Sequence, residues 1–472
     1  MRIATIHGRT TDIDGSVDRL AAGFRGDLIT CGEGRYEESR TIYNGMIDRR
    51  PALIATCADA GDVAAAVRFA GEHDLLTSVR GGGHNGAGLA LCDDGLTIDL
   101  SPMRGTRVDP NGDTVRVQAG CVWGDVDHAT HAVGRAVPSG IISTTGVAGL
   151  TLGGGHGYLT RRYGLTVDNL LEADVVLADG STVTASPERH EDLFWAIRGG
   201  GGNFGVVTSF LFRTHPVSTV FGGPMVWSLE DAEEVLRWYR DFMPNAPEDL
   251  YGFFGFMIVP PGPPFPDELH GHRMGTVVWC HCGDGDGQHA IANAIDGLPS
   301  PAWAHIGEMP YPMLQSAFDE LYAPGLQWYW KGDFVREIGD EAVALHMEHG
   351  SKLPTTHSTM HLYPIDGAPH RVDGDDTAFA HRDANWSMVI AGVDPNPANR
   401  DEITRWARDY WQALHPHSAG GAYVNFMMEE GDDRVRATYG ANHRRLREIK
   451  RRYDPDNLFR VNQNIPPAEE AA

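Results

Sequence analysis

The chain contains three glycine clusters, and they limit its possible folds more strictly than any other feature. The clusters occupy residues 81–86 (GGGHNG), 139–157 (SGIISTTGVAGLTLGGGHG) and 199–205 (GGGGNFG). Two of them match G-x-G-x-x-G, but a Rossmann fold also requires a helix directly after the glycines. The strand-like segment LTIDL follows the first cluster too soon for a crossover helix, and the β-branched run VVTSFLF follows the third. No Gly-Lys-Ser/Thr triplet is present either, so the sequence predicts neither a Rossmann NAD site nor a Walker phosphate-binding loop.

Glycine clusters of this kind can bind an anion, because backbone N–H groups converge on it without a Cβ in the way. The second cluster adds the hydroxyls of Ser143, Thr144 and Thr145, which suit a pyrophosphate held by neutral donors. The alternative is that the glycines form tight turns in a twisted sheet. Three clusters in one region favour a large, phosphate-bearing cofactor. His84 would face that cofactor as a base, ligand or nucleophile; otherwise it is a surface histidine.

Composition excludes some classes of partner. The net charge of −25 argues against nucleic acid, whose phosphates need clustered positive charge. The only lysines are Lys331, Lys352 and Lys450, and this acidic excess is typical of a halophilic protein, with a high-GC organism at ordinary salinity as the alternative. No apolar run is long enough for a membrane span and the N-terminus has no apolar signal core, so we expect a cytoplasmic protein without a membrane partner. The oligomeric state cannot be read from the sequence.

The six cysteines are expected to be free thiols. They are scattered along the chain and contain no C-x-x-C pair, which is typical of a reducing compartment. The triplet Cys280-His281-Cys282 resembles a set of metal ligands. However, the surrounding segment GTVVWCHCGDG alternates like a strand that runs into a turn, so no metal site is predicted.

Periodicity predicts two mixed α+β regions, and 472 residues are enough for two domains. In the first region we expect helices at 59–71, 122–134 and 187–199, the last with Pro187 at its start, and a hairpin folded at Asp179-Gly180. The second region begins near residue 220, with strands at 275–282, 356–365 and 385–393 and a helix at 401–414. A basic helix at 441–453, stopped by Asp454-Pro455, is predicted to be a solvated face.

Four stretches together resemble a known family: RGGGHNGAG, the 139–157 cluster, RGGGGNFGVVTSF and YDPDNLFRVNQNI. In sequence and order they are similar to the berberine-bridge-enzyme-like FAD-linked oxidases of the vanillyl-alcohol-oxidase superfamily. The resemblance implies an α+β fold whose PCMH-type FAD-binding domain has two parts, residues 1–215 and 425–472. A substrate domain, residues 216–424, would be inserted between these parts, with an antiparallel sheet that covers the flavin.

The resemblance also implies that FAD is bound covalently, through a bond between His84 and the 8α-methyl of the flavin. Many family members carry a second link from a cysteine, but Ile142 stands at that position, so we expect a single bond. Thr145 falls at the position that controls oxygen access and is not one of its usual residues, which leaves oxidase and dehydrogenase both open. The other expected cofactor contacts are Arg80, Gly81, Gly82, Gly83, Asn85, Gly86, Ser101, Gly140, Ser143, Thr144, Gly146, Gly149, Gly153, Gly154, Gly155, Gly157, Gly205, Val207, Asn462 and Asn464.

Three catalytic positions depart from the family pattern. Phe426 replaces the tyrosine that commonly serves as base, Met388 the acidic residue that assists it, and Gly86 a tyrosine near the linked histidine. Phenylalanine and methionine cannot accept a proton. This chain therefore cannot use the usual base.

Other side chains remain as candidates. Tyr363 matches a tyrosine that lines the family's active site, and Tyr423 and Asn425 match two positions of a Y-x-N-Y motif. His361 lies one strand repeat before Tyr363 and should share its face of the sheet. The predicted proton acceptor is Tyr363 or His361, either of which would need a depressed or near-neutral pKa. Alternatively, Tyr363 only packs against the flavin and His361 is only buried.

The resulting hypothesis is an oxidoreductase that removes hydride from a C–H bond bearing an alcohol or amine and passes electrons to O2, giving H2O2. A dehydrogenase with another electron acceptor is the alternative within the enzyme class. A flavin-binding protein that has lost its catalytic groups is the alternative outside it. The substrate is expected to be a small molecule, with sugar and secondary metabolite both open. Aromatic residues that could stack on it are Trp303, Tyr322, Trp328, Tyr329 and Trp330.

Overall fold

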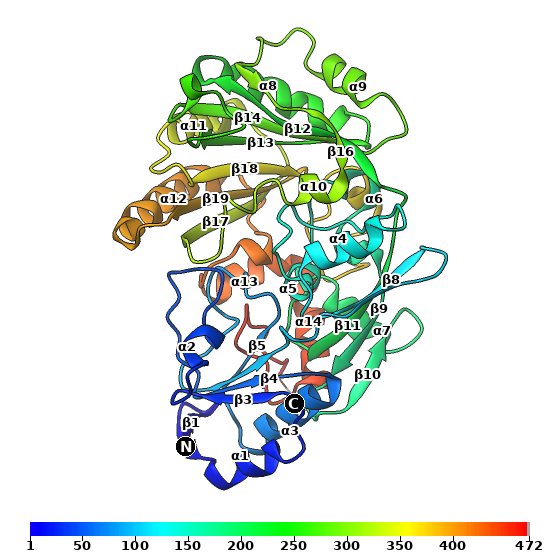
Figure 1. Ribbon diagram of the computed structural model, residues 1–472, viewed down its shortest axis with the longest axis vertical. Helices are drawn as coiled ribbons and strands as arrows, with labels where there is room; N and C mark the ends of the chain where they lie inside the picture. The colour runs from blue at the N-terminus through cyan, green and yellow to red at the C-terminus, as the bar shows by residue number, and fades with distance from the viewer. Residues whose placement is uncertain (470–472) are drawn as a thin grey trace.

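The computed structural model describes residues 1–469 and shows two stacked bodies (Figure 1). We call residues 1–213 together with 420–469 the glycine-rich body, and residues 219–414 the large-sheet body. Both ends of the described chain lie in the glycine-rich body, at the bottom of Figure 1. The large-sheet body lies above it, so the chain leaves the first body once and returns to it. Residues 470–472 of the predicted C-terminal segment lie outside the described residues.

A four-stranded sheet forms the lower part of the glycine-rich body. Its strands, in the order β3-β4-β6-β5, are Asp27–Thr30, Leu53–Thr56, Leu96–Asp99 and Thr77–Arg80. Both β4 and β5 run parallel to β6, and helix α3 (Ala60–Glu72) connects β4 to β5. This helix starts where the Asp59 carboxylate accepts the N–H groups of Gly61 and Asp62. The helix predicted at 59–71 is confirmed.

A five-stranded antiparallel sheet forms the rest of this body. Its strands, in the order β10-β9-β11-β8-β7, are Thr182–Ala185, Leu170–Val176, Val206–Arg213, Thr114–Gln118 and Thr106–Val108. The predicted hairpin is the pair β9 and β10, and Gly180 at its turn has a φ of +76°, which favours glycine. The smaller elements of the body are β1 (Arg2–Ala4), β2 (Thr10–Asp12), α1 (Asp14–Ala21), α2 (Tyr36–Ser39), α4 (Trp123–His131), α5 (Val147–Leu152) and α6 (Thr160–Tyr163).

The helix predicted to begin at Pro187 begins later, as α7 (Glu191–Ile197). Pro187 instead lies in a turn, in which the hydroxyl of Ser186 accepts the backbone N–H of Glu188. Short side chains that bond the nearby backbone compete with helix formation in this way. The predicted start of this helix was therefore wrong by four residues, although the helix itself is confirmed.

The large-sheet body is built on an eight-stranded antiparallel sheet. Seven strands follow the order β15-β12-β14-β13-β18-β19-β17, and β16 (Gly307–Pro310) pairs with β12. In that order the seven are Trp303–Ala304, Thr219–Ser228, Arg273–His281, Leu250–Ile258, Thr359–Pro364, Trp386–Asp394 and Gln327–Val335. One face packs under helices in Figure 1, chiefly α8 (Leu229–Phe242), α9 (Gly287–Ala294), α11 (Asp340–Gly350) and α12 (Arg400–Leu414). The opposite face is turned to the glycine-rich body, and α10 (Tyr311–Gln315) lies between the two bodies (Figure 1). The predicted α+β class with a large antiparallel sheet is confirmed.

The cysteines behave as expected. All six are free, and Cys280 and His281 form the end of β14 as predicted. No cluster of metal-ligating side chains occurs among residues 1–469, and no helix in that range is long and apolar enough to cross a membrane.

The C-terminal helices α13 (Asp432–Tyr439) and α14 (His443–Tyr453) complete the glycine-rich body. Buried residues between 422 and 465 share one hydrophobic core with residues of the two smaller sheets. The prediction that the basic helix is only a solvated face was wrong. Lys450 is fully buried, donates to the Asp454 carboxylate at 2.6 Å and to the carbonyl of Asn203, and burial lowers its pKa to about 8. The other buried residues of the helix are Leu446, Ile449 and Tyr453, and the arginines around Lys450 made its position look exposed in the sequence.

One buried arginine joins the two bodies. Arg161, at the end of the second glycine cluster, is 1% exposed and donates to both carboxylate oxygens of Asp366. It also donates to the carbonyls of Met243 and Ala246 after α8. Every donor nitrogen of the guanidinium is therefore used, which orients the large sheet over the glycine clusters.

Candidate active site

A cavity of about 340 Å³ lies between the glycine clusters and the inner face of the large sheet. Its floor comes from all three glycine clusters, and its roof from strands β17, β18 and β19. Many of the predicted cofactor contacts line it: Gly81, Gly82, Gly83, His84, Asn85, Gly140, Thr145, Gly146, Gly149, Gly205, Val207 and Asn462. The clusters that the sequence placed far apart thus meet at one site.

Other predicted contacts do not reach the cavity wall, because their polar groups are used elsewhere. The Arg80 guanidinium donates to the carbonyl of Ser39 at 2.7 Å, and Ser101 donates to Asp99 at 2.9 Å. Ser143 directs both its hydroxyl and its backbone N–H to Asp319. None of the three lines the cavity, and their assignment to the cofactor stays a prediction.

The remaining predicted contacts also lie outside the lining. Several of the glycines serve close packing. A Cβ on Gly86 would lie 2.3 Å from the Trp330 ring, one on Gly153 would lie 2.5 Å from Asn425, and one on Gly155 would lie 2.2 Å from the hydroxyl of Thr166. These glycines allow close contact between segments, and their assignment to the cofactor stays a prediction. The members of this group are Gly86, Thr144, Gly153, Gly154, Gly155, Gly157 and Asn464.

His84 lies in the cavity wall and is held from one side by Tyr43. The two rings are stacked, with centroids 3.8 Å apart and an interplanar angle of 17°. Burial lowers the pKa of His84 to about 3, although the nearby backbone of Thr144 opposes the shift. The imidazole is therefore neutral at pH 7 and keeps a free nitrogen lone pair. Ile142 also lines the cavity, and none of the described lining residues is a cysteine.

The lining suits a flavin dinucleotide. Among the described residues that line the cavity, none is Asp, Glu, Lys or Arg, so an anion there would be held by neutral donors. Asn462 lines the cavity, and its carboxamide oxygen is buried without a partner within the described chain, so it can accept a hydrogen bond from a bound cofactor. Apolar walls from Val79, Leu152 and Val207 suit a flat ring system.

Strand β18 presents a chain of three polar side chains to the cavity. The Tyr363 hydroxyl lies 2.5 Å from Nδ1 of His361, and Nε2 of His361 lies 2.8 Å from the Thr359 hydroxyl. The Thr359 hydroxyl donates its proton to the carbonyl of Phe256, so it accepts from Nε2–H of His361. Nδ1 is then unprotonated and accepts the proton of Tyr363. The prediction that His361 and Tyr363 share one face is confirmed by this contact.

Residues 51–186 match the FAD binding domain family, and residues 422–466 match the berberine and berberine-like family. An FAD-linked oxidoreductase of Dictyostelium discoideum is 30% identical over 458 residues, which cover 96% of this chain and 97% of that protein. The chain belongs to the berberine-bridge-enzyme-like family of FAD-linked oxidoreductases. It is also 30% identical to (R)-6-hydroxynicotine oxidase of Paenarthrobacter nicotinovorans, over 94% of this chain and 97% of that protein.

The fold agrees with this assignment. The solved structure of 6-hydroxy-D-nicotine oxidase from Arthrobacter nicotinovorans superposes with a TM-score of 0.84 and 28% identity, covering 94% of this chain and 99% of that one. The resemblance predicted from the four sequence stretches is confirmed, and with it the PCMH-type FAD-binding fold.

For a berberine-bridge-enzyme-like protein, the pKa values of the two candidate bases are unexpected. Burial raises the pKa of Tyr363 well above its ordinary value and lowers the pKa of His361 to about 3. The depressed or near-neutral pKa that a base at this position would need is therefore not found for Tyr363. Because neither group is charged at pH 7, the pair works through its hydrogen bond and not through a preformed tyrosinate.

The assignment of Met388 to the position of the family's acidic residue was wrong. Met388 packs among the helices on the far face of the sheet, and its neighbour Val389 lines the cavity. A shift of one residue along a strand reverses the face, because side chains alternate. Phe426 does lie in the cavity wall, with its ring centroid 6.0 Å from that of Tyr363.

Tyr423 and Asn425 line the cavity, but their polar groups are directed at the second glycine cluster. The Tyr423 hydroxyl accepts from the N–H of Gly155 at 3.0 Å and from Nδ2 of Asn425 at 2.8 Å, and Asn425 also donates to the carbonyl of Gly149. Burial raises the pKa of Tyr423 to about 12. Both residues therefore position the short 3₁₀ helix η7 (Val424–Phe426), and their catalytic role stays a prediction. The predicted boundary between residues 424 and 425 falls inside this helix.

His156 is an active-site residue that the sequence analysis missed. It lies in the cavity wall, 6% exposed, with its ring centroid 5.3 Å from Tyr363 and 4.6 Å from Tyr423. Both imidazole nitrogens are buried without a partner in the described chain, and burial lowers the pKa to about 3. A neutral imidazole here offers one donor and one acceptor to a bound molecule. The signal was the repetition of Gly-Gly-Gly-His in the first and second clusters.

The aromatic residues proposed for stacking divide into two groups. Tyr322, Trp328 and Trp330 line the cavity. Trp303 instead packs against Phe265 and His305, and the hydroxyl of Tyr329 accepts from Arg408 of α12. Only the first group can contact a substrate at this site.

Gly82→Ala is expected to destabilise the cofactor site. A Cβ on Gly82 would lie 2.4 Å from Cα of Gly146, so the first and second clusters would be pushed apart by backbone contact. We expect a loss of about 1–3 kcal/mol, as for other overpacking substitutions, and reduced FAD content. The measurement is denaturant unfolding together with the flavin-to-protein absorbance ratio. Gly15→Ala in α1, where a Cβ meets nothing within 4 Å, should change neither quantity; equal behaviour of the two variants would refute the packing argument.

Proposed function

We propose that this FAD-linked oxidoreductase oxidises a small alcohol to the carbonyl compound, R2CH–OH + O2 → R2C=O + H2O2. Bound FAD would supply the hydride acceptor and transfer the two electrons to O2. The observation that carries the proposal is the chain of hydrogen bonds from Tyr363 through His361 to Thr359, which begins at the cavity. The presence of such a chain argues against a flavin-binding protein without catalytic groups.

The roles of the side chains follow from their hydrogen bonds. The proton of Tyr363 points to His361, so its oxygen lone pairs are left to accept the substrate hydroxyl. As the substrate proton moves to the Tyr363 oxygen, the proton of Tyr363 moves to Nδ1 of His361. His156 donates to or accepts from the same substrate oxygen and orients it. Because burial lowers the pKa of His361 to about 3, the imidazole releases the proton readily once the product leaves.

The test of this function is anaerobic mixing of the holoenzyme with a panel of alcohols. Loss of the flavin absorbance, followed by one H2O2 per substrate after O2 is admitted, is the expected result. Reduction without peroxide would indicate a dehydrogenase with another acceptor. No reduction by any alcohol would contradict the proposal.

The proposal includes a covalent bond from His84 to the flavin, and only one such bond. The neutral imidazole in the cavity wall can act as the nucleophile, while Ile142 cannot form a second link. After acid precipitation we expect the native protein pellet to remain yellow, with the flavin on the peptide that contains His84. His84→Ala should lose all colour to the supernatant, and His289→Ala in α9 should behave as the native protein. Colour that stays in the His84→Ala pellet would disprove the single bond.

The rate of the reaction is expected to be nearly independent of pH over the neutral range. A histidine whose pKa is lowered to about 3 stays neutral above that value, and Tyr363, whose pKa is raised, stays protonated. The acceptor Nδ1 is therefore free from roughly pH 5 to 9 and is lost only as the pH falls toward the His361 pKa. The measurement is the pH profile of anaerobic flavin reduction. A profile with a midpoint near pH 6.5, the pKa of an ordinary histidine, would contradict it.

A further inference from the structure

We infer that the substrate is an uncharged alcohol with an apolar tail, and that the tail occupies a second, smaller cavity beside His361. The inference rests on the proposed function, because it takes the substrate to be the molecule whose hydroxyl meets Tyr363. The smaller cavity, about 40 Å³, shares Ile141, Tyr322, Thr359 and His361 with the main one, so the two adjoin each other.

The smaller cavity is lined by apolar side chains from three strands and a loop. Its walls include Phe253, Met257, Val278, Phe318 and Leu321. The Phe253 ring lies against His361, with centroids 4.8 Å apart, and thus begins the apolar wall directly beside the reacting groups. A methylene chain that extends from the reacting carbon past His361 would contact mainly apolar side chains along this wall.

Three of the hydroxyls in these walls already donate to backbone carbonyls. Thr276 donates to the carbonyl of Met225 at 3.0 Å, Thr359 to that of Phe256 at 2.9 Å, and Ser358 to that of Val393 at 3.4 Å. A sugar ring in this space would therefore find no donor among these three hydroxyls, and its oxygens would gain fewer hydrogen bonds than in water. Buried polar groups without partners weaken binding strongly, so the geometry favours an alkyl or aryl group over a second sugar unit.

The absence of charge in the walls points to an uncharged molecule. No Asp, Glu, Lys or Arg occurs among the residues of the described chain that line either cavity. An ammonium or carboxylate group would lose its water without gaining a counter-ion. Tyr363 and His156 present polar groups in the main cavity, whereas most residues that line the smaller cavity are apolar, which matches a ligand with one polar end and one apolar end.

The test uses a homologous series on the holoenzyme: benzyl alcohol, 4-ethylbenzyl alcohol and 4-butylbenzyl alcohol, titrated anaerobically by calorimetry. Each methylene that enters the smaller cavity should lower Kd by about fourfold. The cation 4-butylbenzylamine and the sugar xylobiose should bind at least about tenfold more weakly than 4-butylbenzyl alcohol. Binding and flavin reduction are measured separately, so the Kd values can be interpreted even when an alcohol is not oxidised.

Two substitutions that fill the smaller cavity test whether the gain in affinity with chain length arises there. Leu321→Trp, in a half-buried loop position, should remove the gain from chain length, and Met257→Trp provides a second obstruction if the first fails to fold. Met313→Trp, at a side chain 61% exposed and outside both cavities, should keep the full series. A flat series in the native protein, equal binding of the amine, tighter binding of xylobiose, or a series unchanged in both filled variants would overturn the inference.

Discussion

Replacing Tyr363 with phenylalanine is expected to lower the rate of substrate oxidation by roughly 10²–10⁴-fold, because the first proton acceptor is removed. The substrate hydroxyl would then face a phenyl ring, and Nδ1 of His361 would lose its partner at 2.5 Å. Substrate affinity should change by less than about tenfold, since one neutral hydrogen bond is lost. The measurement is anaerobic stopped-flow flavin reduction, which separates the limiting rate from the Kd. The solvent deuterium effect of the native protein should also disappear in the variant.

Tyr251→Phe is the matched control. Tyr251 lies on the neighbouring strand β13, is 1% exposed, and has a buried hydroxyl without a partner in the described chain. Loss of that hydroxyl should leave the oxidation rate unchanged and should not reduce stability. If Tyr363→Phe retains the native rate while remaining folded, Tyr363 is not the acceptor. If both substitutions lower the rate of flavin reduction equally, the lower rate results from altered packing and not from lost proton transfer.

The parts of the site that could be predicted are those that depend on residues close together in the sequence. The glycine cluster that contains His84 is a short-range pattern that predicts a loop. His361 and Tyr363 are two residues apart on a strand, so their side chains are predicted to share one face of the sheet. The family resemblance then placed the clusters at one cofactor. Predictions failed where a position depended on strand parity alone, as for Met388, or on the start of a helix, as for Pro187.

Other features depend on contacts between segments that are far apart in the chain. Ser143 is withdrawn from the cavity by Asp319, which lies 176 positions later, and Gly86 is required by Trp330. The role of His156 depends on the large sheet, which packs over its ring and leaves both imidazole nitrogens without a partner in the described chain. No local pattern encodes these relations, because each arises from packing between the two bodies.

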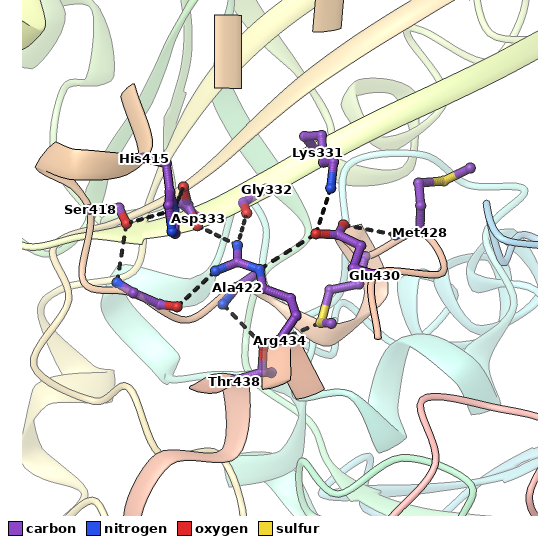
Figure 2. Close-up of polar contacts among 12 residues, drawn as sticks. Lys331, Gly332, Asp333, His415, Ser418, Ala422, Met428, Glu430, Arg434 and Thr438 are labelled. Carbon is purple, nitrogen blue, oxygen red and sulfur yellow. Dashed lines mark hydrogen bonds and ion pairs between the residues drawn. The ribbon is translucent and has the colours of Figure 1, made fainter. Parts of the chain in front are cut away.

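A buried network of charges fixes the position of the segment that carries Phe426. Figure 2 shows Arg434 of α13 at its centre, directed at Asp333 and at the carbonyl of Gly332 on strand β17. Glu430 joins Arg434 at 3.5 Å to Lys331 at 2.7 Å. Asp333 is fully buried and also pairs with His415 at 2.9 Å. Because a Cβ on Gly332 would lie 2.9 Å from that of Phe426, the network sits directly behind the cavity wall.

Arg434→Met is therefore expected to be strongly destabilising. Removing one member of a buried charge network typically costs about 3–5 kcal/mol, since the remaining charges lose their compensation. Here Asp333 keeps His415 and Glu430 keeps Lys331, so we expect a value near about 3 kcal/mol. Methionine retains the volume of the side chain, which limits the packing loss. The measurement is the denaturant midpoint and slope for the holoenzyme.

Arg436→Met on the same helix separates the network from helix composition. Arg436 is 64% exposed and its nearest carboxylate, on the exposed Asp433, lies at 3.6 Å, so its loss should change stability by no more than about 0.5 kcal/mol. A similar loss in both variants would mean that the helix, not the buried network, is responsible. Arg434→Met should also weaken the hold on η7, which carries Tyr423 and Asn425 against the second glycine cluster. We therefore expect its non-covalent hold on FAD to fall with its stability. A variant with lowered stability but native flavin spectrum and native reduction rate would show that the network supports the fold alone.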